Sequence, residues 1–154
     1  MSGNPFEILR KEHETVLEIL DDLEGAVEGE DLKAVEKKID TLEKEFDRHS
    51  IKKEEKVLFP EIEKFVPRDG GPTGAMFSEH KDLVGSIKKF KIAMKAKDFD
   101  ELKDVGKYIV NVLRQHIDKE NNILFIMADM HLDEKQKANI LRKFNEIDAK
   151  LGVH

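Results

Sequence analysis

Two stretches of this chain, HSIKKEEKVLFP at residues 49–60 and HIDKENNILF at residues 116–125, have the same order of chemical groups. Each begins with a histidine, continues through a Lys-Glu pair and ends with Leu-Phe before any proline. His116 and Glu120 are four residues apart, so on a helix their side chains project from one face about one turn apart. The second stretch therefore predicts two ligands that reach one metal cluster together.

The first stretch holds one more residue between its histidine and its glutamate. Lys53 stands four residues after His49, and a charged lysine cannot ligate a metal. Counted back from the Leu-Phe pair, Glu54 matches Glu120, and each has a lysine directly before it. A single inserted residue in a helix is commonly accommodated as a π-bulge, often at a functional site. We therefore predict Glu54 as the ligand, with a helix irregularity near residues 50–53.

Both stretches belong to a longer internal repeat with an offset of 67 residues, in which residues 9–49 match residues 76–116. In each half, two histidines stand 36 residues apart. The matched pairs are Glu12-His13 with Glu79-His80, Ala26 with Ala93, Asp31 with Asp98, Leu32 with Phe99, and His49 with His116. The repeat predicts a pseudo-twofold axis, and a twofold arrangement of ligands suits two metal ions better than one.

Apolar residues recur every three or four positions, which is the spacing of a helix with one buried face. The four stripes contain Phe6, Leu9, His13, Val16, Leu20, Leu23 and Val27; Leu32, Val35, Ile39, Leu42, Phe46 and His49; Met76, His80, Leu83, Ile87, Phe90 and Met94; and Phe99, Leu102, Ile109, Leu113, His116, Glu120 and Ile123. We therefore expect all four histidines of the repeat to face the core.

Helix starts are marked by capping residues at Asn4-Pro5, Asp31, Asp98 and Asp133. The segment PRDGGP at residues 67–72 is an evident loop. We predict helices at roughly 5–28, 31–66, 73–96 and 98–130. A fifth helix begins near Asp133, where Gln136 completes a capping pattern, and carries an apolar stripe of Ile140, Phe144, Ile147 and Leu151.

These elements predict an all-α fold: an antiparallel up-down four-helix bundle with a pseudo-twofold internal repeat and an extra C-terminal helix. A chain of 154 residues with 39% hydrophobic residues suits one domain over residues 1–154. Its core bundle covers about residues 5–130 and its last helix about residues 133–151. Whether this last helix caps its own bundle or mediates a dimer stays open.

Composition excludes several classes of site and partner. The chain contains no cysteine, so any metal must be held by histidine and carboxylate. Its formal net charge of −6 argues against a nucleic-acid partner, which needs a clustered positive surface. We find no apolar segment that suits a membrane span or a signal peptide, and we expect a cytoplasmic protein.

Six residues form the predicted metal site: His13, His49, Glu54, His80, His116 and Glu120. No lysine or arginine lies on the same stripes to pair with them. Without a metal, each unsatisfied buried polar group would cost roughly 1–3 kcal/mol. Ferritin-type bundles use Glu-x-x-His pairs, and none of these histidines has a glutamate three residues before it. We expect His131 and His154 at the surface and Tyr108 as a packing residue at the bundle edge.

The combined motif resembles the hemerythrin or HHE cation-binding family. It is carried by Glu12-His13, by His49 through Glu54 to Leu58-Phe59-Pro60, by Glu79-His80, and by His116-x-x-x-Glu120 with Leu124-Phe125. The resemblance implies a centre of two iron ions with histidines as terminal ligands, Glu54 and Glu120 as bridging carboxylates, and a solvent-derived bridge. An apolar surround would exclude water, a role that we assign to Leu9, Val16, Phe46, Leu83 and Leu113.

One departure from the family bears on function. The family's oxygen carriers have a further histidine one turn after the one on the third helix, where this chain has Val84. The six-ligand type resembles iron-centre repair proteins, whose cysteine-containing region this sequence lacks. We expect a di-iron protein that binds O2 or a related diatomic ligand for sensing, scavenging or delivery. Reduction of NO or peroxide, iron-centre repair, and a metal-stabilised interaction module stay open.

Overall fold

The computed structural model describes residues 4–152, and over this range the chain is all-helical, without a strand. The elements are α1 (Pro5–Glu28), α2 (Leu32–Phe46), η1 (Asp47–Leu58), α3 (Phe59–Ile62), α4 (Pro72–Lys95), α5 (Phe99–Lys119), η2 (Glu120–Leu124), α6 (Phe125–His131) and α7 (Glu134–Lys150). The elements η1 and η2 are π-helical. Each continues its neighbours without a break, so that α2 leads through η1 into α3, and α5 leads through η2 into α6.

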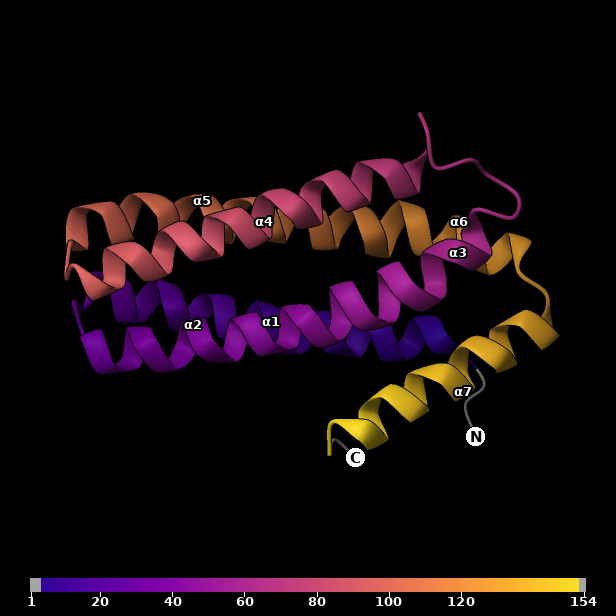
Figure 1. The fold of residues 1–154 in the computed structure, drawn as a ribbon, viewed down its shortest axis with the longest axis horizontal. Coiled ribbons are helices and arrows are strands. Elements are labelled where there is room, and N and C mark those ends of the chain that lie inside the picture. The colour runs from indigo at the N-terminus through magenta and orange to yellow at the C-terminus, as the bar shows by residue number, and fades with distance from the viewer. Residues whose placement is uncertain (1–3, 153–154) are drawn as a thin grey trace.

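The long helices pack into a helical bundle (Figure 1). Helix α1 contacts α2 and α5, and α4 contacts α5 and α2. Helix α7 lies across the bundle against α1 and η1, where Ile140 and Phe144 are buried. The stripe of the last helix is therefore covered, in part, by its own chain, whereas its end at Leu151 is 45% exposed.

The internal repeat extends to backbone conformation. Asp31 caps α2 and Asp98 caps α5, and each side chain accepts a hydrogen bond from a backbone amide three residues ahead. The residues directly before these caps, Glu30 and Lys97, both adopt left-handed conformations, with φ of 51° and 55°. The same tight turn therefore joins α1 to α2 and α4 to α5.

Two predictions need correction, one on where a helix ends and one on which residue is buried. The second long segment was expected to reach residue 66 but ends at Ile62, because turn hydrogen bonds replace the helical ones before Pro67. Ile123 was expected to face the core but is 65% exposed. It lies within η2, whose wider turns shift the residues that follow Glu120 around the helix axis, so that Leu124 is buried instead.

The predicted irregularity near residues 50–53 is present but longer, since η1 covers twelve residues from Asp47 to Leu58. The second π-helical segment, η2, was not expected at all.

The buried apolar side chains form two clusters. The larger contains Leu20, Phe46, Leu83 and Leu113 among others, and the smaller joins Phe6, Phe59 and Phe125 to Phe144 of α7. None of the described helices is long and apolar enough to span a membrane.

Candidate metal centre

The structure brings the six predicted residues together from both halves of the chain. They are His13 on α1, His49 and Glu54 on η1, His80 on α4, His116 on α5, and Glu120 at the start of η2. All six are buried, and none is more than 3% exposed. Each histidine lies on the inward stripe of its helix, which explains why residues far apart in sequence meet at one place.

Their inward atoms form two overlapping groups that share both carboxylates. One group joins His13 and His49 to Glu54 and Glu120, and the other joins His80 and His116 to the same two glutamates. In each group the potential ligand atoms lie within 4.8 Å of one another. A cation in either group would lie within reach of two imidazoles and both carboxylates.

The distances within the groups follow the pseudo-twofold repeat. Glu54 lies 3.0 Å from Nε2 of His49 and 3.3 Å from Nε2 of His80. Glu120 lies 2.9 Å from Nε2 of His13 and 3.2 Å from Nε2 of His116. Each carboxylate thus contacts one histidine of each group.

In each of the four candidate ligand histidines, the nitrogen that points away from the centre, Nδ1, lies against an oxygen acceptor. Nδ1 of His49 lies 2.8 Å from Glu12, and Nδ1 of His116 lies 2.7 Å from Glu79. Nδ1 of His80 lies 2.7 Å from Glu55, and Nδ1 of His13 lies 2.7 Å from the amide oxygen of Asn121. Because an acceptor faces each Nδ1, that nitrogen carries the hydrogen and Nε2 is left to donate its lone pair inward.

Several inward atoms have no hydrogen-bond partner within the described part of the protein: Nε2 of His49, both carboxylate oxygens of Glu54 and Oε2 of Glu120. Nε2 of His80 and Nε2 of His116 are 3.1 Å apart, which at most one shared proton could bridge. Buried polar atoms are normally satisfied. The donors therefore fit bound metal cations, and imidazole with carboxylate suits iron, zinc or manganese.

Without a cation, protons compensate the buried carboxylates. Burial lowers the pKa of His80, but the carboxylates of Glu54 and Glu55 outweigh this and raise it to about 9. Burial likewise opposes charge on His49, whose pKa is nevertheless raised well above its ordinary value by the charge of Glu54. Burial raises the pKa of Glu120, but His116 beside it holds that pKa well below the usual range. The buried carboxylates therefore stabilise positive charge at the centre.

Apolar and aromatic side chains enclose the histidines. Phe125 stacks on His13 at 5.4 Å and Phe59 stacks on His80 at 5.9 Å, each from the same position of the repeat. Phe46 meets His80 edge-on at 5.5 Å. A cavity of about 10 Å³ beside the groups has walls of Val16, Phe46, Leu113 and Ile117. Three of the five residues expected to form the apolar surround line this cavity, and the other two, Leu9 and Leu83, are buried in the neighbouring clusters.

Sequence reasoning missed the residues that hold the outer nitrogens: Glu12, Glu55, Glu79 and Asn121. A signal for two of them was present, because a glutamate precedes a histidine at the same place in both halves. Each of these glutamates supports the histidine of the neighbouring helix rather than the one beside it in sequence. Tertiary contact, which the repeat alone does not reveal, sets this pairing.

The position of Lys53 corrects the expectation that no lysine or arginine would lie on the same buried stripes as the candidate ligands. Its side chain is fully buried, and its ammonium donates to Glu12 rather than to any of the six candidate ligands. The π-helical path of η1 turns Lys53 and Glu54 inward together. A buried lysine next to a candidate metal site is tolerated here because it is paired with carboxylates.

His131, which was expected at the surface, lies outside the site. It is exposed, donates a hydrogen bond from Nδ1 to the carbonyl oxygen of Met127, and stacks on Phe65 at 4.8 Å. Since a carbonyl only accepts, Nδ1 of His131 is the donor. His154 lies beyond the described residues.

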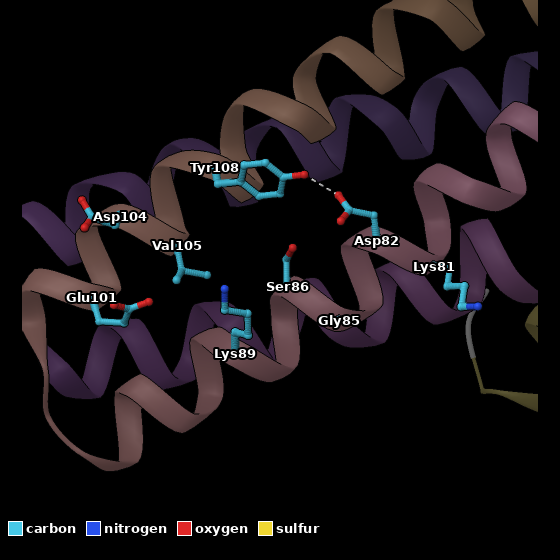
Figure 2. A pocket seen from close by; sticks show the side chains of 9 residues that line it. All are labelled: Lys81, Asp82, Gly85, Ser86, Lys89, Glu101, Asp104, Val105 and Tyr108. Atoms are coloured by element: carbon cyan, nitrogen blue, oxygen red, sulfur yellow. Dashed lines mark hydrogen bonds between the residues drawn. The ribbon is translucent and has the colours of Figure 1, made fainter.

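Tyr108 lies on a wide surface groove of about 670 Å³ between α4 and α5 (Figure 2). Its hydroxyl donates to Asp82 at 2.6 Å and so links the two helices at the bundle edge. The groove is lined mainly by charged side chains and includes none of the six candidate ligands.

Comparison with known proteins agrees with this geometry. The family model described as hemerythrin HHE cation binding domain matches residues 4–128. No curated protein and no solved structure matches the chain.

Proposed function

The chain belongs to the hemerythrin HHE cation-binding family, and from this premise we propose that it is a di-iron protein that binds O2 or a related diatomic ligand. One observation carries the proposal: the six buried side chains form two groups of four that share Glu54 and Glu120. Iron bound there would supply redox chemistry and a coordination position for a small ligand.

The protein's own residues have three roles in this function. The four imidazoles, through Nε2, and the carboxylates of Glu54 and Glu120 would hold the iron. The acceptors at Nδ1 orient each ring and raise its basicity. Val16, Phe46 and Leu113 keep water from the ligand side, and the cavity of about 10 Å³ that they line admits only a very small ligand.

We further infer that the four long helical segments form the antiparallel up-down bundle expected from the repeat, within one domain. Consecutive segments joined by the tight turns at Glu30 and Lys97 contact each other, which supports this arrangement. A pseudo-twofold axis would then pass between Glu54 and Glu120.

A second function is favoured by Val84, which is partly buried against the larger apolar cluster. The oxygen carriers of the family have a histidine at this position. One ligand fewer would leave more open coordination on the side of His80, and this would favour reduction of NO or peroxide over reversible binding.

Metal loading followed by spectroscopy tests the proposal. The metal-free chain is loaded with Fe²⁺ without oxygen, the iron is counted, and the visible spectrum is followed as O2 is added and removed. Two irons per chain and an absorption band that follows O2 reversibly support binding. Consumption of NO or peroxide with an added electron donor supports the second function. A colourless protein that retains zinc and rejects iron would overturn both and leave a structural role for the metal.

A further inference from the structure

Helix α7 begins beyond the residues that match the family, and it places a carboxylate against the cations next to the candidate metal centre. Asp148 is partly buried, and its carboxylate faces the ammonium of Lys53 and the guanidinium of Arg48. We propose that Asp148 is a positioning residue that selectively strengthens metal binding at the position of His13 and His49. This inference rests on the two-metal function proposed above.

A continuous path of ion pairs and hydrogen bonds connects Asp148 to His49. Oδ1 of Asp148 lies 2.9 Å from Nζ of Lys53 and 2.9 Å from Nη1 of Arg48. Both cations also donate to Oε2 of Glu12, Arg48 at 3.0 Å. Oε1 of Glu12 accepts a hydrogen bond from Nδ1 of His49 at 2.8 Å. The charge on α7 therefore acts on a metal-facing imidazole through the two cations and Glu12.

The other half of the repeat offers an internal comparison. Nδ1 of His116 donates to Glu79 at 2.7 Å, and Lys119 donates to the same carboxylate. The side chain of Lys119 is 45% exposed, whereas its counterpart in the first half is fully buried. The exposed Gln115 stands at the position that corresponds to Arg48. Among the described elements, none covers this half as α7 covers the other, so solvent screens its charges.

The charge of Asp148 matters because its partners are buried. A buried cation that loses one of its carboxylates depends more on those that remain, because an uncompensated buried charge is costly. Without Asp148, Lys53 would rely on Glu12 alone and Arg48 on Glu12 and Glu45, so the oxygens of Glu12 would accept more weakly from His49. The imidazole becomes a poorer donor to a metal, and one more uncompensated positive charge opposes a cation nearby.

Coupling of this kind is reciprocal. If docking of α7 strengthens metal binding at His13 and His49, a metal bound there strengthens docking of α7 by the same factor. Docking of α7 against the bundle would therefore depend on whether a metal is bound at His13 and His49.

Titration of the full metal-free chain with Co²⁺, followed by visible absorption and calorimetry, tests the inference. The wild type is expected to take two ions. In Asp148→Asn, one ion should bind as in the wild type and the other about 10-fold more weakly. Asp148→Glu should restore the second ion. Glu146→Gln, which removes an exposed charge of α7 paired with Arg142, should change neither.

Two further variants identify the affected position. Glu79→Gln should weaken the ion held by His80 and His116, and the double variant with Asp148→Asn should weaken both ions additively. A titration of Asp148→Asn that matches the wild type, or that loses both ions equally, overturns the inference and leaves the two-metal function standing. A wild type that takes no metal overturns the function itself.

Hydrogen exchange of the wild type keeps the inference testable if Asp148→Asn does not fold. Backbone amides of α7 should exchange more slowly after Co²⁺ loading, because the bound ion strengthens docking. Equal exchange of α7 with and without Co²⁺, in a chain that has bound two ions, would overturn the coupling.

Discussion

The backbone carbonyls of Glu54 and Glu120 accept equivalent hydrogen bonds. Each accepts from the amide five residues ahead, that of Phe59 in one half and that of Phe125 in the other. Each candidate bridging carboxylate thus begins a π-helical turn that ends at the phenylalanine stacked on a histidine. The shared turn fixes the register between ligand and aromatic wall.

This register predicts opposite effects for two deletions of the same residue type. Deletion of Lys52 shortens the interval between His49 and Glu54 to that between His116 and Glu120, so two metals should still bind. Deletion of Lys56 breaks the interval from Glu54 to Phe59 and should abolish most metal binding. Iron content after anaerobic loading, with circular dichroism for helix content, measures the difference. Equal metal content in both variants would refute the register argument.

Removal of a shared carboxylate should affect both metal positions at once. We expect Glu120→Ala to lose most metal, because both groups of ligands include Glu120. His116→Ala should lose the metal held by His80 and His116, because it removes one of the two imidazoles of that group. His131→Ala is the matched control, because His131 lies at the surface against Phe65. Similar metal content in all three variants, measured by elemental analysis, would disprove the ligand assignment.

Much of this centre could be predicted because short stretches of the sequence contain the patterns that identify its residues. Leu58-Phe59 and Leu124-Phe125 provided the alignment that selects Glu54 rather than Lys53, and capping residues placed most helix starts within one residue. The second π-helical segment could not be found in this way. A comparison of halves reveals only what differs between them, and the turn after Glu120 is common to both.

The remaining features could not be predicted because they depend on contacts between residues that are far apart in the sequence. That Glu12 supports His49 depends on how α1 packs against η1, which no spacing along one helix specifies. The burial of Lys53 depends on α7, an element outside the repeat. In both cases, the missing information was which helix faces which.

The raised histidine pKa values predict opposite pH dependence for stability and for metal binding. A proton on His80 is bound more tightly in the folded state, with a pKa of about 9 against 6.5 when unfolded. This contribution to the stability of the metal-free protein is complete below pH 6.5 and is lost as the pH rises through about 9. A metal must displace the same proton, so its apparent affinity rises with pH over this range.

Thermal melts and Co²⁺ titrations between pH 6.5 and pH 9 check this prediction. The metal-free protein should melt at lower temperature toward the alkaline end, while the gain in melting temperature on Co²⁺ loading grows. His131→Ala should show the same trends as the wild type. Metal affinity that does not change with pH would show that no proton is displaced from the centre.

The apolar wall predicts that ligand retention and fold stability can be separated. Leu113→Ala and Leu20→Ala each empty a buried site in the same cluster, and each should lower the free energy of unfolding by about 2–5 kcal/mol. Only Leu113 lines the small cavity beside the histidines. Its removal enlarges that cavity next to polar ligand atoms, where water can then enter. The O2-dependent absorption band of the iron-loaded protein should therefore decay faster in Leu113→Ala, whereas in Leu20→Ala its lifetime should match the wild type. If both variants shorten the lifetime equally, general loosening of the bundle rather than the cavity wall controls access, and the assigned role of Leu113 is wrong.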